Sequence, residues 1–96
     1  MQKTHWDAKA YAKHAKQIKA LCKAENLKAV ILKDSCAHVG EYSFNGLPCD
    51  ISEEIGFNPD YLASMPSGTL YYKDKNSPIM IDTANDEKAV LMPIRV

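Results

Sequence analysis

The chain has 96 residues, the size of one small domain, and 46% of them are apolar, which excludes an intrinsically disordered protein. Twelve basic and twelve acidic residues give a formal net charge of zero, which argues against a protein that binds nucleic acid over its whole surface but allows a local basic face. We therefore expect one globular domain spanning residues 1–96.

The first predicted element is a long helix over about residues 6–26, which are rich in alanine and lysine and contain neither glycine nor proline. Asp7 is suited to cap its N-terminus and Asn26 to end it. Helical periodicity places these apolar residues on one side: Tyr11, Ala15, Ile18, Leu21 and Cys22. The opposite side carries a stripe of lysines that no acid interrupts: Lys9, Lys13, Lys16, Lys19 and Lys23. Ten of the twelve acids follow residue 33, so positive charge is concentrated around this helix.

Short strands are predicted after the helix. Residues 27–33 form an apolar run that favours a strand. Residues 37–44 predict another strand, in which Gly40 marks a weak point or a bulge, and Asn45 with Gly46 predicts a turn. Residues 47–52 are predicted to be irregular and residues 54–57 to form a strand.

A second, short helix is predicted to begin at Asn58, a good N-cap residue that precedes Pro59 and Asp60. Pro66 and Gly68 end it. Three strands are expected to follow, at residues 69–73, 78–82 and 89–96. This order predicts an α+β fold with two helices packed on one side of antiparallel sheets, in which the second half repeats the layout of the first in shorter form.

Three segments of the C-terminal half carry a family resemblance: EIGFNPDYL at residues 54–62, SPIMI at residues 77–81 and AVLMPIRV at residues 89–96. In this order they resemble a strand-to-helix segment, the next strand and the C-terminus of the last domain of bacterial DNA polymerase III beta sliding clamps. The resemblance covers roughly residues 54–96, and the N-terminal half is similar only in layout. It implies a single DNA-clamp-like domain.

The resemblance also implies a function, that of a processivity factor in DNA replication or repair, without catalysis or a cofactor. In such clamps, helices present positive charge to double-stranded DNA, which implies DNA contact by Lys9, Lys13, Lys16, Lys19 and Lys23. Replication proteins bind through a short peptide motif beside the C-terminus, at positions similar to Pro78, Val90, Met92, Pro93, Ile94 and Arg95. Clamp domains pair strands across subunit edges, so a homo-oligomer is compatible with this resemblance.

Two features depart from the clamp pattern. A bacterial clamp subunit has three such domains, and much of its peptide pocket comes from the preceding one, whereas this chain has room for one domain. The second helix carries Asp60 and no lysine, so it lacks the expected attraction for DNA. The chain is either an excised fragment or a small free-standing protein of phage or mobile-element origin. The alternative function is that of a small protein-binding module or clamp mimic of such an origin, without DNA contact.

The two candidate interfaces have plainer interpretations. A lysine stripe is often a solvated helix face that serves solubility. Strand alternation places Val90, Met92 and Ile94 on the same face, so we expect at least one of them to be packed in the core.

The cysteines and histidines indicate no reactive centre. Three cysteines at irregular spacing argue against a disulfide scaffold, and with no signal peptide or membrane-spanning run they favour a reducing cytoplasm. His5, His14, Cys36, His38 and Cys49 lack the spacing of common zinc sites, so no metal is expected, and His14 is expected to pack at the edge of the apolar helix face. Neither a P-loop, a nucleophile elbow nor a dinucleotide motif is present, so we expect no enzymatic activity.

Overall fold

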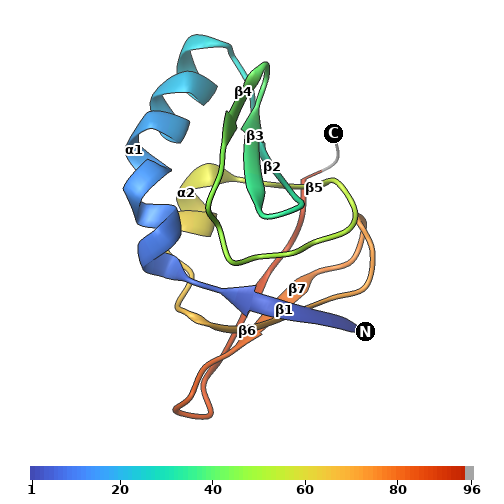
Figure 1. The fold of residues 1–96 in the computed structure, drawn as a ribbon. Helices are drawn as coiled ribbons and strands as arrows, with labels where there is room; N and C mark the ends of the chain where they lie inside the picture. Colours follow the sequence, from blue (N-terminus) through green and yellow to red (C-terminus); the bar gives the residue numbers. More distant parts are fainter. Residues whose placement is uncertain (95–96) are drawn as a thin grey trace.

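The computed structural model describes residues 1–94, in which two helices and eight strands form two similar units (Figure 1). The first unit contains β1 (Gln2–Trp6), α1 (Ala8–Ala24), β2 (Val30–Lys33), β3 (Cys36–Val39) and β4 (Tyr42–Phe44). The second contains β5 (Ile55–Phe57), α2 (Pro59–Ala63), β6 (Gly68–Tyr72), β7 (Ile79–Asp82) and β8 (Lys88–Leu91). Each unit runs strand, helix and three strands, so the predicted repetition of layout is confirmed.

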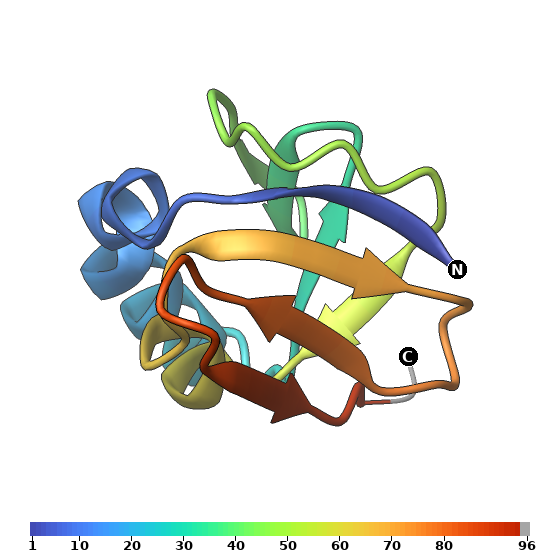
Figure 2. The ribbon, with the colours of Figure 1, turned by 90° about the horizontal axis from the view of Figure 1, so that it is seen from below.

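The two units exchange their first strands. One sheet has the order β1-β6-β7-β8 and the other β4-β3-β2-β5, and all neighbouring strands are antiparallel. Strand β1 therefore extends the sheet of the second unit, and β5 extends that of the first. Figure 2 shows the two helices side by side on one side of the sheets, as the α+β prediction required.

The start of the chain differs from the prediction. The helix was expected from about residue 6, but Trp6 is the last residue of β1, a strand that the sequence analysis did not anticipate. Strand β1 pairs with β6 along its whole length, and Trp6 lies opposite Gly68. The Asp7 carboxylate caps α1 as predicted, because its Oδ1 accepts hydrogen bonds from the backbone N–H groups of Lys9 (3.0 Å) and Ala10 (3.2 Å).

The end of α1 follows the predicted stop at Asn26, which adopts the left-handed conformation at φ 55°. The Leu27 N–H donates to the Cys22 carbonyl at 2.8 Å, and the Asn26 N–H donates to the Lys23 carbonyl at 3.3 Å. These two bonds form a Schellman motif, which satisfies carbonyls that the helix leaves unpaired. The motif turns the chain sharply and places Leu27 next to the end of the helix.

Two tight hairpins follow β2, and the second divides the region predicted as one strand at residues 37–44. Asp34 and Ser35 connect β2 to β3, and both have positive φ, as a type I′ turn requires. Gly40, at φ 59°, is the first of two loop residues between β3 and β4, the position that a type II′ turn reserves for glycine. The single predicted strand is therefore two strands, with Gly40 at a chain reversal instead of a bulge.

The segment from residue 45 to 54, which connects the two units, is irregular as predicted but contributes to the core. Its alternate residues Leu47, Cys49 and Ile51 are at most 2% exposed. Backbone hydrogen bonds join it to the β2–β3 turn, with the Ser35 N–H donating to the Cys49 carbonyl at 3.1 Å and the Asp34 N–H to the Ile51 carbonyl at 2.9 Å. This segment therefore covers one end of the β2–β3 hairpin.

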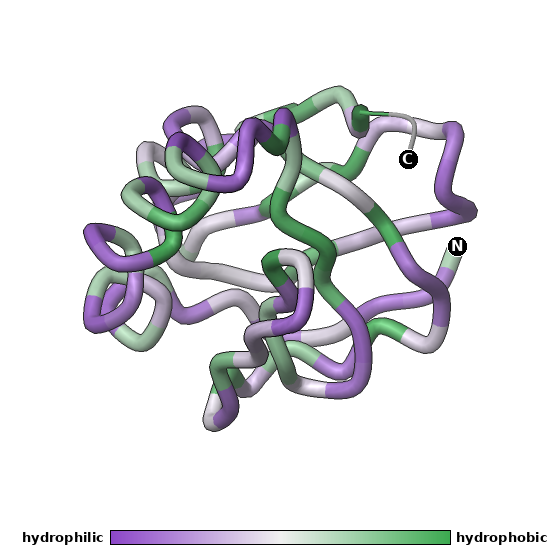
Figure 3. Tube along the Cα trace, turned by 90° about the horizontal axis from the view of Figure 1, so that it is seen from above, coloured by the Kyte–Doolittle hydropathy of each residue, from purple (hydrophilic) through white to green (hydrophobic). Residues whose placement is uncertain are grey.

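The core contains Trp6, Ile18 and Phe57 together with the inward residues of both sheets, and none of the buried residues in 1–94 is charged. Along the chain trace, hydrophobic residues are concentrated in the strands that cross the interior, and hydrophilic residues recur on the turns of the helices (Figure 3). Within the described residues, neither helix is long and apolar enough to cross a membrane.

Candidate functional site

The lysine stripe lies on the solvent-facing side of α1. All five of its lysines are exposed, whereas Tyr11, Ile18 and Cys22 on the opposite side are buried. The two faces predicted from helical periodicity are therefore confirmed as a basic face and a core face. In Figure 1, α1 lies at the outer edge of the molecule.

Helix α2 packs beside α1 and brings a negative charge to the stripe. The Asn58 side chain caps α2, accepting from the N–H groups of Asp60 at 2.9 Å and Tyr61 at 3.3 Å. This position sets the Asp60 carboxylate 3.3 Å from the Lys19 ammonium. Both side chains are well exposed, at 60% and 69%, so the pair contributes little to stability but engages one lysine of the stripe.

The strand leading to the C-terminus exposes apolar side chains. Leu91 is buried, whereas Val90 is 63% exposed and Met92 is 62% exposed. The expectation that at least one of Val90, Met92 and Ile94 packs in the core is wrong, because β8 turns its other face inward and none of the three is among the buried core residues. Ile94 is half-buried. An edge strand that leaves large apolar side chains in water is a candidate binding surface.

Ile94 joins the two sheets. Its N–H donates to the carbonyl of Gly56 in β5 at 2.7 Å, so the chain passes from the edge of one sheet to the edge of the other. There it borders a hollow of about 430 Å³ between α1 and α2, which we call the helix hollow. The helix hollow is lined by Lys19, Cys22, Lys23, Leu27, Lys28, Asn58, Pro59, Asp60 and Ile94.

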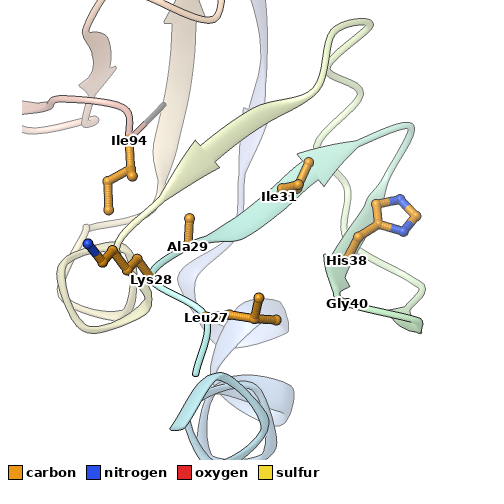
Figure 4. Close-up of a pocket in the computed structure, with 7 residues that line it drawn as sticks. All are labelled: Leu27, Lys28, Ala29, Ile31, His38, Gly40 and Ile94. Carbon is orange, nitrogen blue, oxygen red and sulfur yellow. The ribbon is translucent and has the colours of Figure 1, made fainter. Parts of the chain in front are cut away.

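A second depression lies on the outer face of β2 and β3, and we call it the sheet hollow. It measures about 340 Å³ and is lined by Leu27, Lys28, Ala29, Ile31, His38, Gly40 and Ile94 (Figure 4). In Figure 4, His38 borders it on the β3 side and Ile94 and Lys28 border it on the opposite side. The two hollows share Leu27, Lys28 and Ile94, so they form one extended concave surface that includes residue 94.

The predicted peptide-binding residues are not all on this surface. Of the six, Ile94 lines both hollows, while Pro78 is exposed just before β7 and Pro93 is half-buried. Arg95 lies outside the described residues. Leu27, Lys28 and Asn58 were not predicted as binding residues, although Asn58 was predicted as a helix cap. The available signal for Leu27 was its position directly after the helix-ending Asn26.

Among the described residues, no group of three or more His, Cys, Asp or Glu side chains is placed to hold a metal ion. Burial raises the pKa of the Cys49 thiol to about 12 and also raises the pKa of Cys22, so both remain protonated and unreactive near neutral pH. The partly exposed Cys36 donates from Sγ to Oδ1 of Asn45 at 2.8 Å. His14 packs against Phe44 with ring centroids 5.3 Å apart, which confirms the packing role expected for it.

Comparison with known proteins bears on the fold. No protein-family model matches the chain, and no curated protein matches it either. Among solved structures, a DNA polymerase III subunit beta sliding clamp from Bartonella birtlesii matches over 100% of this chain, with a TM-score of 0.57 and 21% sequence identity. The chain has a sliding-clamp-like fold.

The clamp-like fold covers only part of that subunit, since this chain spans 31% of the length of the matched clamp chain. The clamp-like fold places α1 and α2 together on one side of two antiparallel sheets, as described above. It therefore brings the lysine stripe and the helix hollow next to each other, because Lys19 and Lys23 belong to both.

Proposed function

We propose that this chain acts as a sliding-clamp-like, non-catalytic domain in DNA replication or repair. It contacts double-stranded DNA through the lysine stripe and partner peptides through the surface beside its C-terminus. The observation that carries the proposal is the clamp-like fold over the whole chain, combined with five exposed lysines on one face of α1.

DNA contact by α1 requires only electrostatics. Lysines that face phosphates release counterions and attract the duplex without reading its sequence, which is the kind of contact that permits sliding. Lys9, Lys13, Lys16 and Lys23 are exposed and form no ion pair within residues 1–94, while Lys19 is paired with Asp60. We therefore assign four free lysines to DNA.

Peptide contact is supported by exposed apolar surface. Val90, in the edge strand β8, and Met92, just after it, are exposed. Ile94 and Leu27 line both hollows. Methionine and aliphatic side chains adapt to varied partner side chains. A surface of this composition binds an extended segment with apolar anchors better than it binds a charged small molecule.

The test of the DNA assignment is the salt dependence of duplex binding, measured by fluorescence anisotropy. Four phosphate contacts predict a slope of about −3.6 in log K against log salt, and a roughly 150-fold loss of affinity between about 50 and 200 mM salt. Replacing Lys9, Lys13, Lys16 and Lys23 by glutamine should abolish this binding.

The matched control changes four exposed lysines outside the stripe to glutamine: Lys3, Lys73, Lys75 and Lys88. It removes the same net charge, so a loss of binding confined to the stripe variant supports a specific face. Equal losses in both variants, or no duplex binding at low salt, would reject DNA contact by α1 and favour a protein-binding module instead.

A further inference from the structure

The helix hollow is lined by apolar residues and by four charged ones, Lys19, Lys23, Lys28 and Asp60, which we call its rim. Leu27 is 38% exposed and, with Ile94, offers apolar surface to a ligand. The rim carries three ammonium groups, from Lys19 and Lys23 of α1 and from Lys28, which follows the Schellman turn. Lys28 follows the sharp turn at the end of α1 and lines the same hollow as Lys19 and Lys23, so these charges border one depression.

The charge of this rim is unbalanced. Its one acidic residue, Asp60, is 3.3 Å from Lys19. Within residues 1–94, Lys23 and Lys28 form no ion pair, and both side chains are exposed. After the pair is counted, two positive charges remain beside a hollow of about 430 Å³ whose lining also includes Leu27 and Ile94.

We propose that the helix hollow binds a protein segment in which apolar residues are flanked by acidic ones, and that Lys23 and Lys28 recognise the acidic residues. This rests on the proposed peptide-binding function and adds the chemistry of the partner. Because Lys23 is also assigned to DNA, the peptide and the duplex compete for this residue. The apolar side chain lies against Leu27 and Ile94, and the flanking carboxylates reach the two ammonium groups. Charged rims of this kind select partners and set the register of an apolar anchor, and they disfavour basic segments by like-charge repulsion.

The experiment uses two fluorescent peptides that differ only in charge, GDDLLDDG and GNNLLNNG, titrated against the full chain. Asparagine matches the shape of aspartate, so the comparison isolates the carboxylates. Two exposed ion pairs predict about fivefold tighter binding of the acidic peptide at low salt. This preference should shrink as salt screens the charges.

Two double variants test which lysines cause the preference for the acidic peptide. K23Q with K28Q should bind both peptides equally, whereas the control K73Q with K75Q loses the same charge in the loop after β6, away from both hollows, and should keep the preference. All four lysines are exposed, so the variants should fold, which circular dichroism checks.

Three outcomes contradict part or all of this reasoning. Equal binding of the two peptides by the unmodified chain, or a preference that survives in the K23Q/K28Q variant, overturns the acidic-partner proposal and leaves peptide binding itself intact. Binding of neither peptide overturns both, because the neutral peptide reports on the apolar surface alone.

Discussion

Two buried tyrosines should respond in opposite directions to loss of the hydroxyl group. Tyr11 is 1% exposed, and its hydroxyl has no hydrogen-bond partner within residues 1–94. Tyr72 is 2% exposed, but its hydroxyl donates to Oε1 of Gln2 at 3.0 Å and accepts from the N–H of Ser52 at 3.3 Å. The same Tyr→Phe substitution therefore removes an unsatisfied polar atom in one case and a satisfied one in the other.

The magnitudes follow from the cost of burying polar atoms. A buried polar group without a partner costs about 1–3 kcal/mol, whereas a typical satisfied hydrogen bond contributes about 1 kcal/mol. Y11F should raise the free energy of unfolding by about 1 kcal/mol, and Y72F should lower it by about 1 kcal/mol. In a domain of this size each change corresponds to about 4 °C or more in melting temperature.

Denaturant titration followed by the fluorescence of Trp6 measures both values, since this single tryptophan is buried with its ring centroid 5.4 Å from that of Tyr11. Circular dichroism gives an independent transition, because Y11F alters the surroundings of the fluorophore. If Y11F destabilises the protein as much as Y72F does, the Tyr11 hydroxyl is satisfied and the reasoning is wrong.

The buried Tyr11 hydroxyl also predicts that the free energy of unfolding depends on pH in the alkaline range. Burial, followed by the charges of Cys22 and Asp60, raises the pKa of Tyr11 above its usual value of 10.0. Above about pH 10 the unfolded chain loses this proton while the folded chain keeps it, so stability falls as pH rises, by at most about 1.4 kcal/mol per pH unit from this group. Y11F should remove this contribution, leaving a shallower alkaline decline than in the unmodified protein. Equal slopes for both proteins would contradict the assignment.

Three other substitutions or reactions test separate features. G68A should lower the free energy of unfolding by about 2 kcal/mol, because a Cβ at Gly68 would clash with a backbone carbonyl of β7. A neutral effect in denaturant titration would show that β6 and β7 can move apart to make room for the Cβ. D60N should release Lys19 and steepen the salt slope of DNA binding by about 0.9, whereas D86N, the same change in a distant turn, should leave the slope unchanged. With Ellman's reagent at about pH 8, one thiol should react rapidly in the folded protein and three should react after denaturation. C36S should abolish the rapid phase. A rapid phase that persists in C36S would mean that a buried thiol is accessible.

Local chemistry was sufficient to predict the helices and their faces. The 3.6-residue repeat separated the lysine stripe from Tyr11 and Ile18 without any knowledge of tertiary contacts, because a surface helix exposes one face to solvent and packs the other against the core. Asp7, Asn26 and Asn58 marked the helix ends correctly, since caps act within a few residues. The resemblance of residues 54–96 to a clamp domain led to the correct fold class.

Strand β1 and the segment from residue 45 to 54 could not be predicted in this way. Residues 2–6 have little apolar pattern of their own and are a strand because β6 supplies hydrogen-bond partners more than sixty residues later in the chain. Leu47 and Cys49 are buried because the connecting segment crosses the β2–β3 turn. Neither partner is visible in a local window of sequence.

The sequence by itself determined where the helices lie, which residues share a face and where positive charge is concentrated, because these depend on spacing along one element. Only the tertiary structure decided that β8 turns Leu91 inward and leaves Val90 and Met92 in water, because alternation defines two faces of a strand and the opposing sheet selects between them. The helix hollow was likewise decided by tertiary structure, since Leu27, Asn58 and Ile94 meet only through the packing of α1 on α2 and the pairing of residue 94 with β5.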